Sequence, residues 1–470
     1  MASEQIRVAI IGSGPSGFYA ADHLLKQRDP LVHVDMYERL PTPFGLVRGG
    51  VAPDHAKIKS VTKLYSRIAR HERFNFFGNI EFGTDVTRAD LSKAYHGIIY
   101  AVGAQTDKKL GIPGEDLGNS FAATEFVGWY NGHPDYHDYD FDLTGIKRVA
   151  VIGVGNVAMD VARILARTSE ELYETDIADY ALKSLQSSEV EEIIVLGRRG
   201  PAQAAFTNPE IKELGEMADA DIVVSLEEAT LDKLSAAELK ASGDRAAARN
   251  VDILRSYATR ELRGRSRRII MRFLVSPVAL LGRDKVEAIR IVRNELYLDE
   301  RGSLRPRATE RQETLPVDMV FRSVGYRGVR LPDVPFYDPW GTIPNDHGRV
   351  LTDHEGGEYL VGNYVVGWIK RGPSGIIGTN KPDAIESANR FLEDLQVKRV
   401  LEPIDTRGET ILDLIQSRKP TYCSFADWER LDAIERQRGA ESGRSRVKFT
   451  TVEDMLAALG KSEQAPEASS

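Results

Sequence analysis

Residues 8–17 read Val8-Ala9-Ile10-Ile11-Gly12-Ser13-Gly14-Pro15-Ser16-Gly17, an apolar run followed by the pattern G-x-G-x-x-G. The apolar run predicts a buried strand, and the residues from Phe18 to Leu25 predict a helix. In such a turn the first glycine permits the tight bend, the second lets backbone N–H groups approach a pyrophosphate, and the third keeps the helix close to the strand. We therefore expect a dinucleotide site at this turn.

A second strand and an acidic residue follow at the expected distance. Residues 32–38 alternate apolar and polar side chains and end in Glu38, which lies 21 residues after Gly17. A carboxylate there accepts hydrogen bonds from ribose hydroxyls. The alternative is a solvated acid at a strand end.

A second turn of the same kind begins about 140 residues later, in Val149-Ala150-Val151-Ile152-Gly153-Val154-Gly155-Asn156-Val157-Ala158. The strand after its helix, residues 193–196, ends in Gly197-Arg198-Arg199 rather than in an acid. Two guanidinium groups offer charge-assisted hydrogen bonds to a 2′-phosphate, which an acid would repel. The second nucleotide is therefore predicted to be NADP, unless the arginines form only an exposed basic turn.

Composition and charge narrow the function classes. The chain has 470 residues, 42% of them hydrophobic, and a formal net charge of −8, which argues against general nucleic-acid binding. Cys423 is the only cysteine, so a redox-active dithiol, an intramolecular disulfide and a cysteine-held cluster are excluded. No apolar signal segment or run of 18 apolar residues is present, so we expect a cytoplasmic protein without membrane insertion.

The two turns imply an α/β protein with two Rossmann-like dinucleotide-binding domains. Three further apolar runs predict buried strands at residues 97–104, 318–325 and 359–368. The last of these returns to the first domain, which makes that domain discontinuous. We predict an FAD-binding domain at residues 1–108 and 326–470, with a C-terminal helical extension, and an NADP-binding domain at residues 109–325.

The C-terminal third offers weaker signals. Glycines precede a predicted helix at about residues 382–395, and a helix N-terminus there would suit a partly anionic flavin ring, although an ordinary glycine-rich loop is the alternative. Phe425, Trp428, Leu431 and Ile434 recur at helical spacing, and Thr450 to Glu453 is similar to a capping box. Residues 462–470 have the composition of a disordered tail.

Several longer blocks resemble the adrenodoxin reductase family of NADPH–ferredoxin reductases, and the C-terminal segment resembles the bacterial members of that family more than the mitochondrial ones. The resemblance covers residues 6–395 and is carried by three blocks: Pro41-Thr42-Pro43-Phe44-Gly45-Leu46-Val47-Arg48 with Val51-Ala52-Pro53-Asp54-His55, Gly197-Arg198-Arg199-Gly200-Pro201 with Ala205-Phe206-Thr207, and Gly367-Trp368-Ile369-Lys370-Arg371-Gly372-Pro373-Ser374-Gly375.

The resemblance implies a set of cofactor-binding residues and two active-site residues. The FAD residues are Gly12, Ser13, Gly14, Pro15, Ser16, Gly17, Glu38, Leu46, Trp368, Gly375, Ile376 and Ile377; the NADP residues are Lys108, Asn156, Val157, Ala158, Arg198, Arg199 and Glu210, with Gly375 near the nicotinamide. His55 and Glu210 match the active-site histidine and glutamate. The chain departs from the family at Asn208-Pro209, before Glu210, and at Lys108, where some members have arginine.

The implied reaction moves electrons from NADPH through FAD to a [2Fe–2S] ferredoxin, with no metal held by the chain itself. The cofactors carry the chemistry. Glu210 is therefore expected to stabilise positive charge that develops on the nicotinamide, and His55 is expected to order water or a proton path near the flavin. Two other classes stay open: an NADPH-dependent flavoprotein monooxygenase, and a non-catalytic scaffold that binds FAD and NADP. The identity of the ferredoxin, the pathway and the oligomeric state are not predicted.

One basic stretch suggests where an acidic partner binds. Residues 245–272 contain nine arginines and only two acids, Asp252 and Glu261. The implied ferredoxin is acidic, and complementary charge raises the association rate. We therefore predict docking near Arg245–Arg272; the alternative is a solvated helix face.

Overall fold

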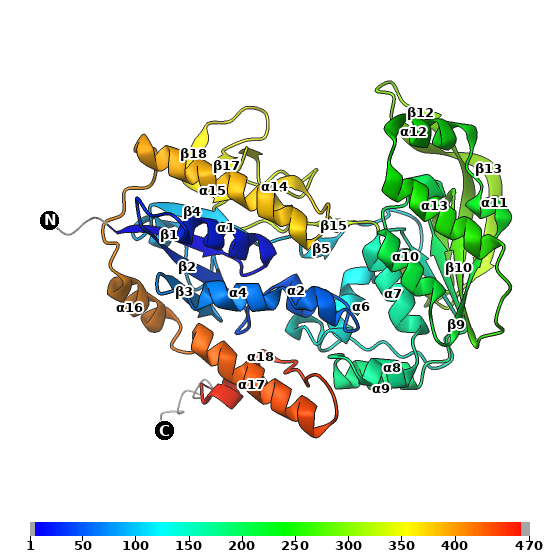
Figure 1. Cartoon of the computed structure of the whole chain (residues 1–470), viewed down its shortest axis with the longest axis horizontal. Coiled ribbons are helices and arrows are strands. Elements are labelled where there is room, and N and C mark those ends of the chain that lie inside the picture. Colours follow the sequence, from blue (N-terminus) through cyan, green and yellow to red (C-terminus); the bar gives the residue numbers. More distant parts are fainter. Residues whose placement is uncertain (1–4, 462–470) are drawn as a thin grey trace.

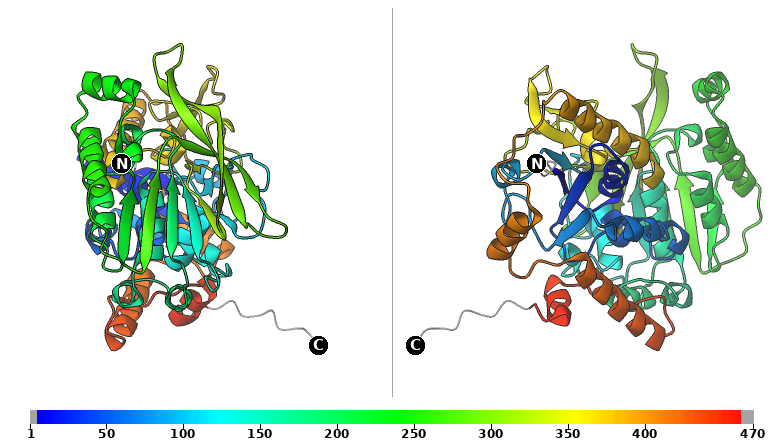
Figure 2. Two further views of the ribbon diagram at one scale, coloured as in Figure 1. Left: turned by 90° about the vertical axis from the view of Figure 1, so that its right-hand side faces the viewer. Right: turned by 60° about the vertical axis from the view of Figure 1, so that its left-hand side comes forward.

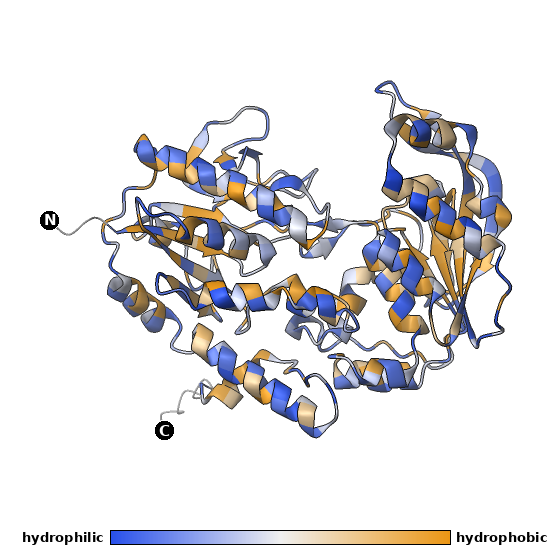
Figure 3. Cartoon of the chain, in the orientation of Figure 1, coloured by the Kyte–Doolittle hydropathy of each residue, from blue (hydrophilic) through white to orange (hydrophobic). Residues whose placement is uncertain are grey.

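The computed structural model describes residues 5–461, which form two mainly parallel sheets with helices packed around each (Figures 1 and 2). Figure 3 shows apolar residues concentrated along the strands and on the inner sides of the helices. Two sheets covered by helices on their faces are the architecture of paired dinucleotide-binding domains. The predicted fold class is confirmed.

The first sheet has seven strands in the order β16-β17-β18-β4-β1-β2-β3. Every residue of β1 is buried, because strands flank it on both sides and helices cover its faces. Strand β18 pairs in parallel with β4, so a late segment of the chain completes a sheet begun by the first hundred residues. The strands are β1 (Ile6–Ile11), β2 (Val32–Glu38), β3 (Phe74–Gly78), β4 (Gly97–Tyr100), β16 (Asn345–Asp346), β17 (Arg349–Leu351) and β18 (Tyr359–Val365).

Helices α1 and α15 pack against each other beside this sheet. Short helices between β2 and β3 carry the segment that the sequence singled out from Pro41 onward. The helices of this part are α1 (Pro15–Leu25), α2 (Leu46–Gly49), α3 (Ala56–Lys59), α4 (Thr62–Ala69), α5 (Arg88–Ser92), α14 (Trp368–Arg371) and α15 (Asn380–Gln396), with the 3₁₀ turn η3 (Ile377–Thr379).

The second sheet has six strands in the order β6-β14-β7-β8-β10-β9, all parallel. Its strands are β6 (Ser120–Ala122), β7 (Arg148–Ile152), β8 (Glu192–Leu196), β9 (Ala220–Val224), β10 (Arg267–Arg272) and β14 (Met319–Arg322). The helices are α6 (Ala123–Tyr130), α7 (Asn156–Ala166), α8 (Ser169–Tyr173), α9 (Asp179–Gln186), α10 (Asn208–Gly215), α11 (Leu226–Ala229), α12 (Lys233–Ser242) and α13 (Arg245–Ala258), with the 3₁₀ turns η1 (Pro134–Tyr136) and η2 (Pro201–Gln203).

The remaining strands form two smaller sheets. Long antiparallel strands β11 (Val275–Leu281), β12 (Ala288–Leu298) and β13 (Leu304–Pro316) form a three-stranded sheet beside the second sheet (Figure 2). Strands β5 (Thr106–Asp107) and β15 (Tyr326–Arg327) pair where the chain passes between the two large sheets for the first and second time.

Each of the three long predicted strands ends earlier than expected. The structure ends them at Tyr100, Arg322 and Val365. Each apolar run continues into a glycine with positive φ, at Gly103 (+70°), Gly325 (+107°) and Gly367 (+75°). Since that conformation turns the chain out of the sheet, the apolar pattern overestimated the strand lengths. The predicted helix at residues 382–395 begins earlier, at Asn380.

The C-terminal extension is helical, as predicted, and consists of α16 (Gly408–Arg418), α17 (Phe425–Glu441) and α18 (Val452–Leu459). Phe425, Trp428 and Leu431 are buried, and Ile434 packs against the same core. The predicted cap of the last helix was displaced by one residue: Thr451, rather than Thr450, accepts the hydrogen bond from the backbone N–H of Asp454. The predicted disordered tail lies outside the described residues.

Within residues 5–461 no helix combines the length and apolar character that crossing a bilayer requires.

Candidate active site

The first glycine-rich turn leaves its middle glycine open. A Cβ on Gly12, at φ +103°, would lie 2.7 Å from the Ala101 carbonyl oxygen, and one on Gly17 would lie 2.4 Å from the Gly12 oxygen. Gly14 has no atom within 4 Å of its Cβ position. The packing of the turn itself therefore requires glycine at positions 12 and 17. Gly14 instead faces open space, where a pyrophosphate would lie.

Glu38 lies directly against this turn. Its carboxylate accepts hydrogen bonds from the Ser13 backbone N–H at 3.1 Å and from the Ser13 hydroxyl at 2.6 Å. A second carboxylate oxygen accepts from the Leu40 N–H at 3.2 Å. Glu38 is therefore a fixed, half-buried acid at the turn rather than a freely solvated one, which fits a ribose-binding role.

The segment from Phe44 to Leu46 covers the other side of the turn. The Phe44 N–H donates to the Ser13 carbonyl oxygen at 3.1 Å, and a Cβ on Gly45 would lie 3.0 Å from the Gly14 Cα. This contact places the partly buried Leu46 at the start of α2, beside the open face of the turn.

Trp368 carries a buried polar atom without a partner. Its indole Nε1 forms no hydrogen bond to any of residues 5–461, and its ring lies 5.3 Å from that of Tyr326, centroid to centroid. Gly375 and Ile376, which follow α14, are exposed, and Ile377 is partly buried. An unpaired buried donor fits a ligand with acceptor atoms, such as a flavin ring.

The second turn repeats the geometry of the first. A Cβ on Gly153, at φ +136°, would lie 2.1 Å from the Ser323 carbonyl oxygen, whereas Gly155 has no atom within 4 Å of its Cβ position. Asn156 begins α7 and accepts the Thr207 N–H at 2.9 Å, and Val157 and Ala158 follow in its first turn. Both turns thus present an open middle glycine at the start of a helix.

Arg198 and Arg199 follow β8, as the sequence predicted. Arg198 is exposed, and one Arg199 nitrogen lies 3.5 Å from the Gln203 carbonyl oxygen. Burial and the neighbouring Arg198 lower the pKa of the Arg199 guanidinium, and neither arginine forms an ion pair within the described part of the chain. Lys108 is exposed in the ribbon between the sheets, where its N–H donates to the Gly325 carbonyl oxygen at 3.0 Å.

A fully buried guanidinium joins the two domains. Arg163 on α7 bonds Asp54 at 2.7 and 3.1 Å, Asp160 at 2.6 Å and Glu210 at 3.0 Å. Asp54 comes from the first domain and also pairs with Arg167 at 2.6 Å. Charged hydrogen bonds satisfy both edges of the guanidinium, which is the condition for burying it stably.

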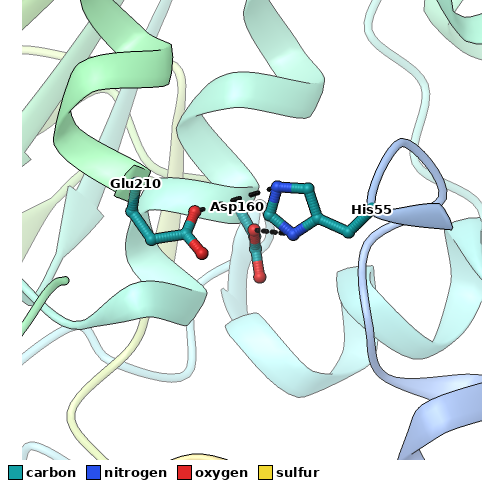
Figure 4. Close-up of side chains that lie close together, drawn as sticks. All are labelled: His55, Asp160 and Glu210. Atoms are coloured by element: carbon teal, nitrogen blue, oxygen red, sulfur yellow. Dashed lines mark ion pairs between the residues drawn. The ribbon is translucent and has the colours of Figure 1, made fainter. Parts of the chain in front are cut away.

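His55, next to Asp54, reaches the same network. Figure 4 shows its ring facing Asp160 and Glu210, with Nδ1 3.9 Å from Asp160 and Nε2 4.0 Å from Glu210. A shorter contact of 2.9 Å joins Nε2 to Glu213, on the turn of α10 after Glu210. The structure therefore brings His55 and Glu210 together, and it adds Glu213, Asp54, Asp160 and Arg163, which the sequence reasoning did not select.

The network shifts the protonation of its members. Burial, reinforced by the nearby Asp160, raises the pKa of Glu210 to about 7. Burial alone would lower the pKa of His55, but the hydrogen bond to Glu213 and the neighbouring acids hold it above its ordinary value. The bond to His55 correspondingly lowers the pKa of Glu213. A proton can thus reside on this cluster near neutral pH.

His55, Asp160 and Glu210 each have a ligand atom within 4.8 Å of the others. Such a set can bind a metal ion, yet Arg163 already bonds both carboxylates. A divalent cation would have to compete with this guanidinium at short range. We therefore interpret the cluster as an ion-pair network.

Asn208 and Pro209, at which the chain departs from the family's sequence, form the beginning of α10. Pro209 lies in the first helical turn, where its missing N–H removes no helix hydrogen bond. The Asn208 side chain donates to the Ala246 carbonyl oxygen at 2.9 Å and to the Asn250 side-chain oxygen at 2.6 Å. The helix start is therefore well anchored, and it leaves Glu210 bonded to Arg163.

The arginine-rich stretch divides into two groups. Arg267 donates to the carbonyl oxygens of Val190 and Arg167, and Arg268 and Arg272 pair with acids on neighbouring elements. Arg260 and Arg263 also bond the carbonyl oxygen of Gly215. The exposed arginines that form no side-chain bond within residues 5–461 are Arg245, Arg249, Arg255 and Arg265.

Comparisons with known proteins agree with this geometry. A family model described as pyridine nucleotide-disulphide oxidoreductase matches residues 6–196. The NADPH-ferredoxin reductase FprA of Mycobacterium tuberculosis is 46% identical over 458 residues, covering 96% of this chain and 98% of that protein. The chain belongs to the adrenodoxin reductase family of NADPH–ferredoxin reductases.

Other members of the family match along nearly the whole chain. The mitochondrial NADPH:adrenodoxin oxidoreductase of Arabidopsis thaliana is 39% identical over 466 residues, covering 97% of this chain and 96% of that protein. The solved structure of Mycobacterium tuberculosis FprA in complex with NADPH superposes with a TM-score of 0.91 at 44% identity and covers 97% of this chain and all of that one. The lone cysteine separates this chain from disulphide reductases, which need a dithiol.

Proposed function

We propose that this chain is an NADPH–ferredoxin reductase that passes electrons from NADPH through FAD to ferredoxin. The observation that carries the proposal is a pair of open glycine turns, one per domain, with the His55–Arg163 network joining the domains between them. A chain that binds two dinucleotides and lacks a dithiol suits electron transfer between bound cofactors.

FAD is assigned to the first domain and NADP to the second. The proposed FAD residues are the turn from Gly12 to Gly17, Glu38, Leu46, Trp368 and the segment from Gly375 to Ile377; the proposed NADP residues are Lys108, Asn156, Val157, Ala158, Arg198, Arg199 and Glu210. When bound, FAD accepts a hydride from NADPH and releases the electrons one at a time, as an iron–sulfur acceptor requires. The boundaries at 108/109 and 325/326 belong to this proposal, and so does a cytoplasmic location.

The chain itself contributes charge and orientation. Glu210, held by Arg163, places a carboxyl group that can exchange a proton near neutral pH at the junction of the domains. His55 is held by Glu213 from the opposite domain. The ionised Glu210 carboxylate can stabilise positive charge that develops as hydride leaves the nicotinamide, and His55 can hold a proton at Nε2.

The ferredoxin is proposed to be an acidic [2Fe–2S] protein that docks at the exposed arginines of the 245–272 stretch. Arg249 and Arg255, on α13, form no ion pair within the described residues, so their charges are available to a partner. Arg267 is removed from the proposed surface, because its guanidinium bonds carbonyl oxygens of the chain itself.

The test measures NADPH-driven reduction of an acidic [2Fe–2S] ferredoxin. The reduced ferredoxin passes its electron to cytochrome c, whose absorbance change gives the rate. We expect turnover that falls steeply as salt rises, and further loss in the double variant Arg249→Glu, Arg255→Glu. Arg283 and Arg311 are exposed and free of side-chain bonds within residues 5–461, so Arg283→Glu, Arg311→Glu is the matched control. No ferredoxin reduction by the unmodified protein would contradict the function; equal loss in both double variants would contradict only the docking surface.

A further inference from the structure

The C-terminal extension contacts both domains along one short stretch. Helix α17 runs beneath the first domain toward α8 and α9 of the second (Figure 1). Beyond its end, the Ser442 carbonyl oxygen accepts the Tyr173 hydroxyl at 2.7 Å, and Arg444 bonds Asp179 and the Ile177 carbonyl oxygen. We call residues 424–451 the C-terminal strap.

The strap fixes the segment that covers the first glycine turn. Glu435, whose side chain is fully buried, accepts hydrogen bonds from Arg48 at 2.9 and 2.5 Å and from Arg446 at 2.8 Å. The Arg48 guanidinium also lies 5.0 Å from the centre of the Trp428 ring. Arg48 belongs to the same short helix, α2, as Leu46 of the proposed FAD site. The strap therefore fixes the position of this helix through its bonds to Arg48.

Lys448 lies where the strap meets both domains. Its ammonium donates to the Arg48 carbonyl oxygen at 3.3 Å, in the first domain, and to the Asn131 carbonyl oxygen at 3.0 Å, at the end of α6 in the second. It also pairs with Asp176 at 3.2 Å, which bonds Lys59 of the first domain at 2.6 Å. The Lys448 side chain is 2% exposed.

Burial lowers the pKa of Lys448 well below its usual range and the neighbouring Asp176 opposes this shift, so the side chain is stably accommodated only while its hydrogen-bond partners stay in place. Here those partners come from two domains that are otherwise connected covalently only by the β5–β15 passage. Any rotation of one domain against the other would leave Lys448 buried with an incomplete set of acceptors. The contact therefore penalises relative motion of the two domains.

We infer that Lys448 is a positioning residue for hydride transfer: through Arg48, Asn131 and Asp176 it sets the orientation of the NADP domain relative to the FAD domain. The inference rests on the proposed function. Its physical basis is that hydride transfer depends steeply on the alignment of the two rings, so that a small misplacement of the domains slows the step strongly.

The test compares Lys448→Met with Lys461→Met. Lys461 is a matched control, because its ammonium bonds Asp427 and the Tyr422 carbonyl oxygen within the C-terminal extension and forms no hydrogen bond or ion pair to the second domain within residues 5–461. Stopped-flow reduction of bound flavin by saturating NADPH, without oxygen, gives the rate. We expect Lys448→Met to lower that rate by about tenfold or more, with the Kd for NADP⁺ changed less than about threefold, and Lys461→Met to match the unmodified protein.

Rates are expressed per bound flavin, so a purely structural role, which lowers FAD content or Tm, would leave them unchanged and would overturn the inference. Should Lys448→Met fail to fold, Arg444→Gln removes the strap's bonds to Asp179 and Ile177 of the second domain and so loosens the seating of Lys448, and we expect the rate to fall by about threefold or more. A rate within twofold of the unmodified protein in that variant would also overturn the inference. Failure of the unmodified protein to be reduced by NADPH would instead contradict the proposed function.

Discussion

At the scale of single residues, Arg163 organises the site. Its guanidinium is completely buried and bonds acids from both domains, so it neutralises charges that would otherwise repel one another. Removing one partner from such a buried network leaves an uncompensated charge, which is strongly destabilising. Arg163 thus accounts for the close approach of Asp54, Asp160 and Glu210 to one another beside His55.

The His55–Glu213 bond predicts a pH-dependent contribution to stability. The raised pKa of His55 means that its contribution is complete below the unfolded pKa of about 6.5 and is lost as pH rises through the folded value; the lowered pKa of Glu213 means that its contribution is present above about 4.5 and is lost in acid. We expect Glu213→Gln to lower Tm by about 2 °C near pH 6 and by less near pH 9.

The control for this prediction is Glu216→Gln, which changes an exposed glutamate at the end of the same helix. Thermal scans from pH 5 to pH 9 would follow both variants. A Tm difference for Glu213→Gln that stayed constant over this range would show that the bond does not couple to the His55 proton.

Nucleotide choice is the second prediction at this scale. Arg198 and Arg199 have no acidic ion-pair partner in the described part of the chain, so NADPH should be preferred over NADH. The double variant Arg198→Ala, Arg199→Ala should lose about 1.5–3 kcal/mol per charged hydrogen bond, seen as a raised KM for NADPH. The KM for NADH serves as the internal control, because no 2′-phosphate is present. Equal kcat/KM for both nucleotides in the unmodified protein would contradict the assignment.

The sequence predicted some of these residues and missed others for a physical reason. His55 and Glu210 stand in motifs that can be recognised along the chain, and so do Arg198 and Arg199. Arg163 and Asp54 are far apart in sequence and meet only when α7 packs against the first domain. Glu213 lies three residues after Glu210, so helical spacing would have placed both on one face of α10.

At the scale of elements, both strand–turn–helix units use their glycines alike. The backbone of Gly14 has φ −78° and that of Gly155 has φ −105°, conformations that residues with side chains adopt freely. Neither glycine has an atom within 4 Å of its Cβ position. The packing of the protein alone therefore does not require glycine at either position, whereas the pyrophosphate proposed to bind at each turn would require it.

Paired substitutions test the interpretation that a bound pyrophosphate requires Gly14 and Gly155. We expect Gly14→Leu to give folded, colourless protein, because the side chain blocks the FAD pyrophosphate, and Gly155→Leu to keep FAD while losing reduction by NADPH. Each variant is the control for the other, since both introduce the same side chain at matched positions. Absorbance at flavin wavelengths and anaerobic reduction are the measurements. Full flavin content in Gly14→Leu would contradict the assigned cradle.

Element boundaries show what apolar patterning can predict. Strand β2 matches its predicted range at residues 32–38, because an acid and polar turn residues end it. The strands ending at Tyr100, Arg322 and Val365 were overestimated, since the apolar residues continue past the point where a positive-φ glycine turns the chain. Hydrophobicity reports burial, and these turns are buried as well.

At the scale of the whole molecule, three sets of connections hold the two nucleotide-binding domains together. The β5–β15 ribbon connects them covalently, the Arg163 network joins α7 to the turn at Asp54 in the first domain, and the C-terminal strap spans both. The discontinuous first domain was predictable from a late apolar strand. The role of residues 424–451 was not, because it depends on contacts between segments about 400 residues apart, such as Lys448 with Arg48.

One chain brings NADPH and FAD together for electron transfer. The most direct measurement is the visible absorption spectrum of the purified protein before and after addition of one equivalent of NADPH without oxygen. We expect a flavin spectrum that bleaches promptly with NADPH and far more slowly with the same amount of NADH. A protein without flavin, or a bound flavin that NADPH leaves oxidised, would contradict it.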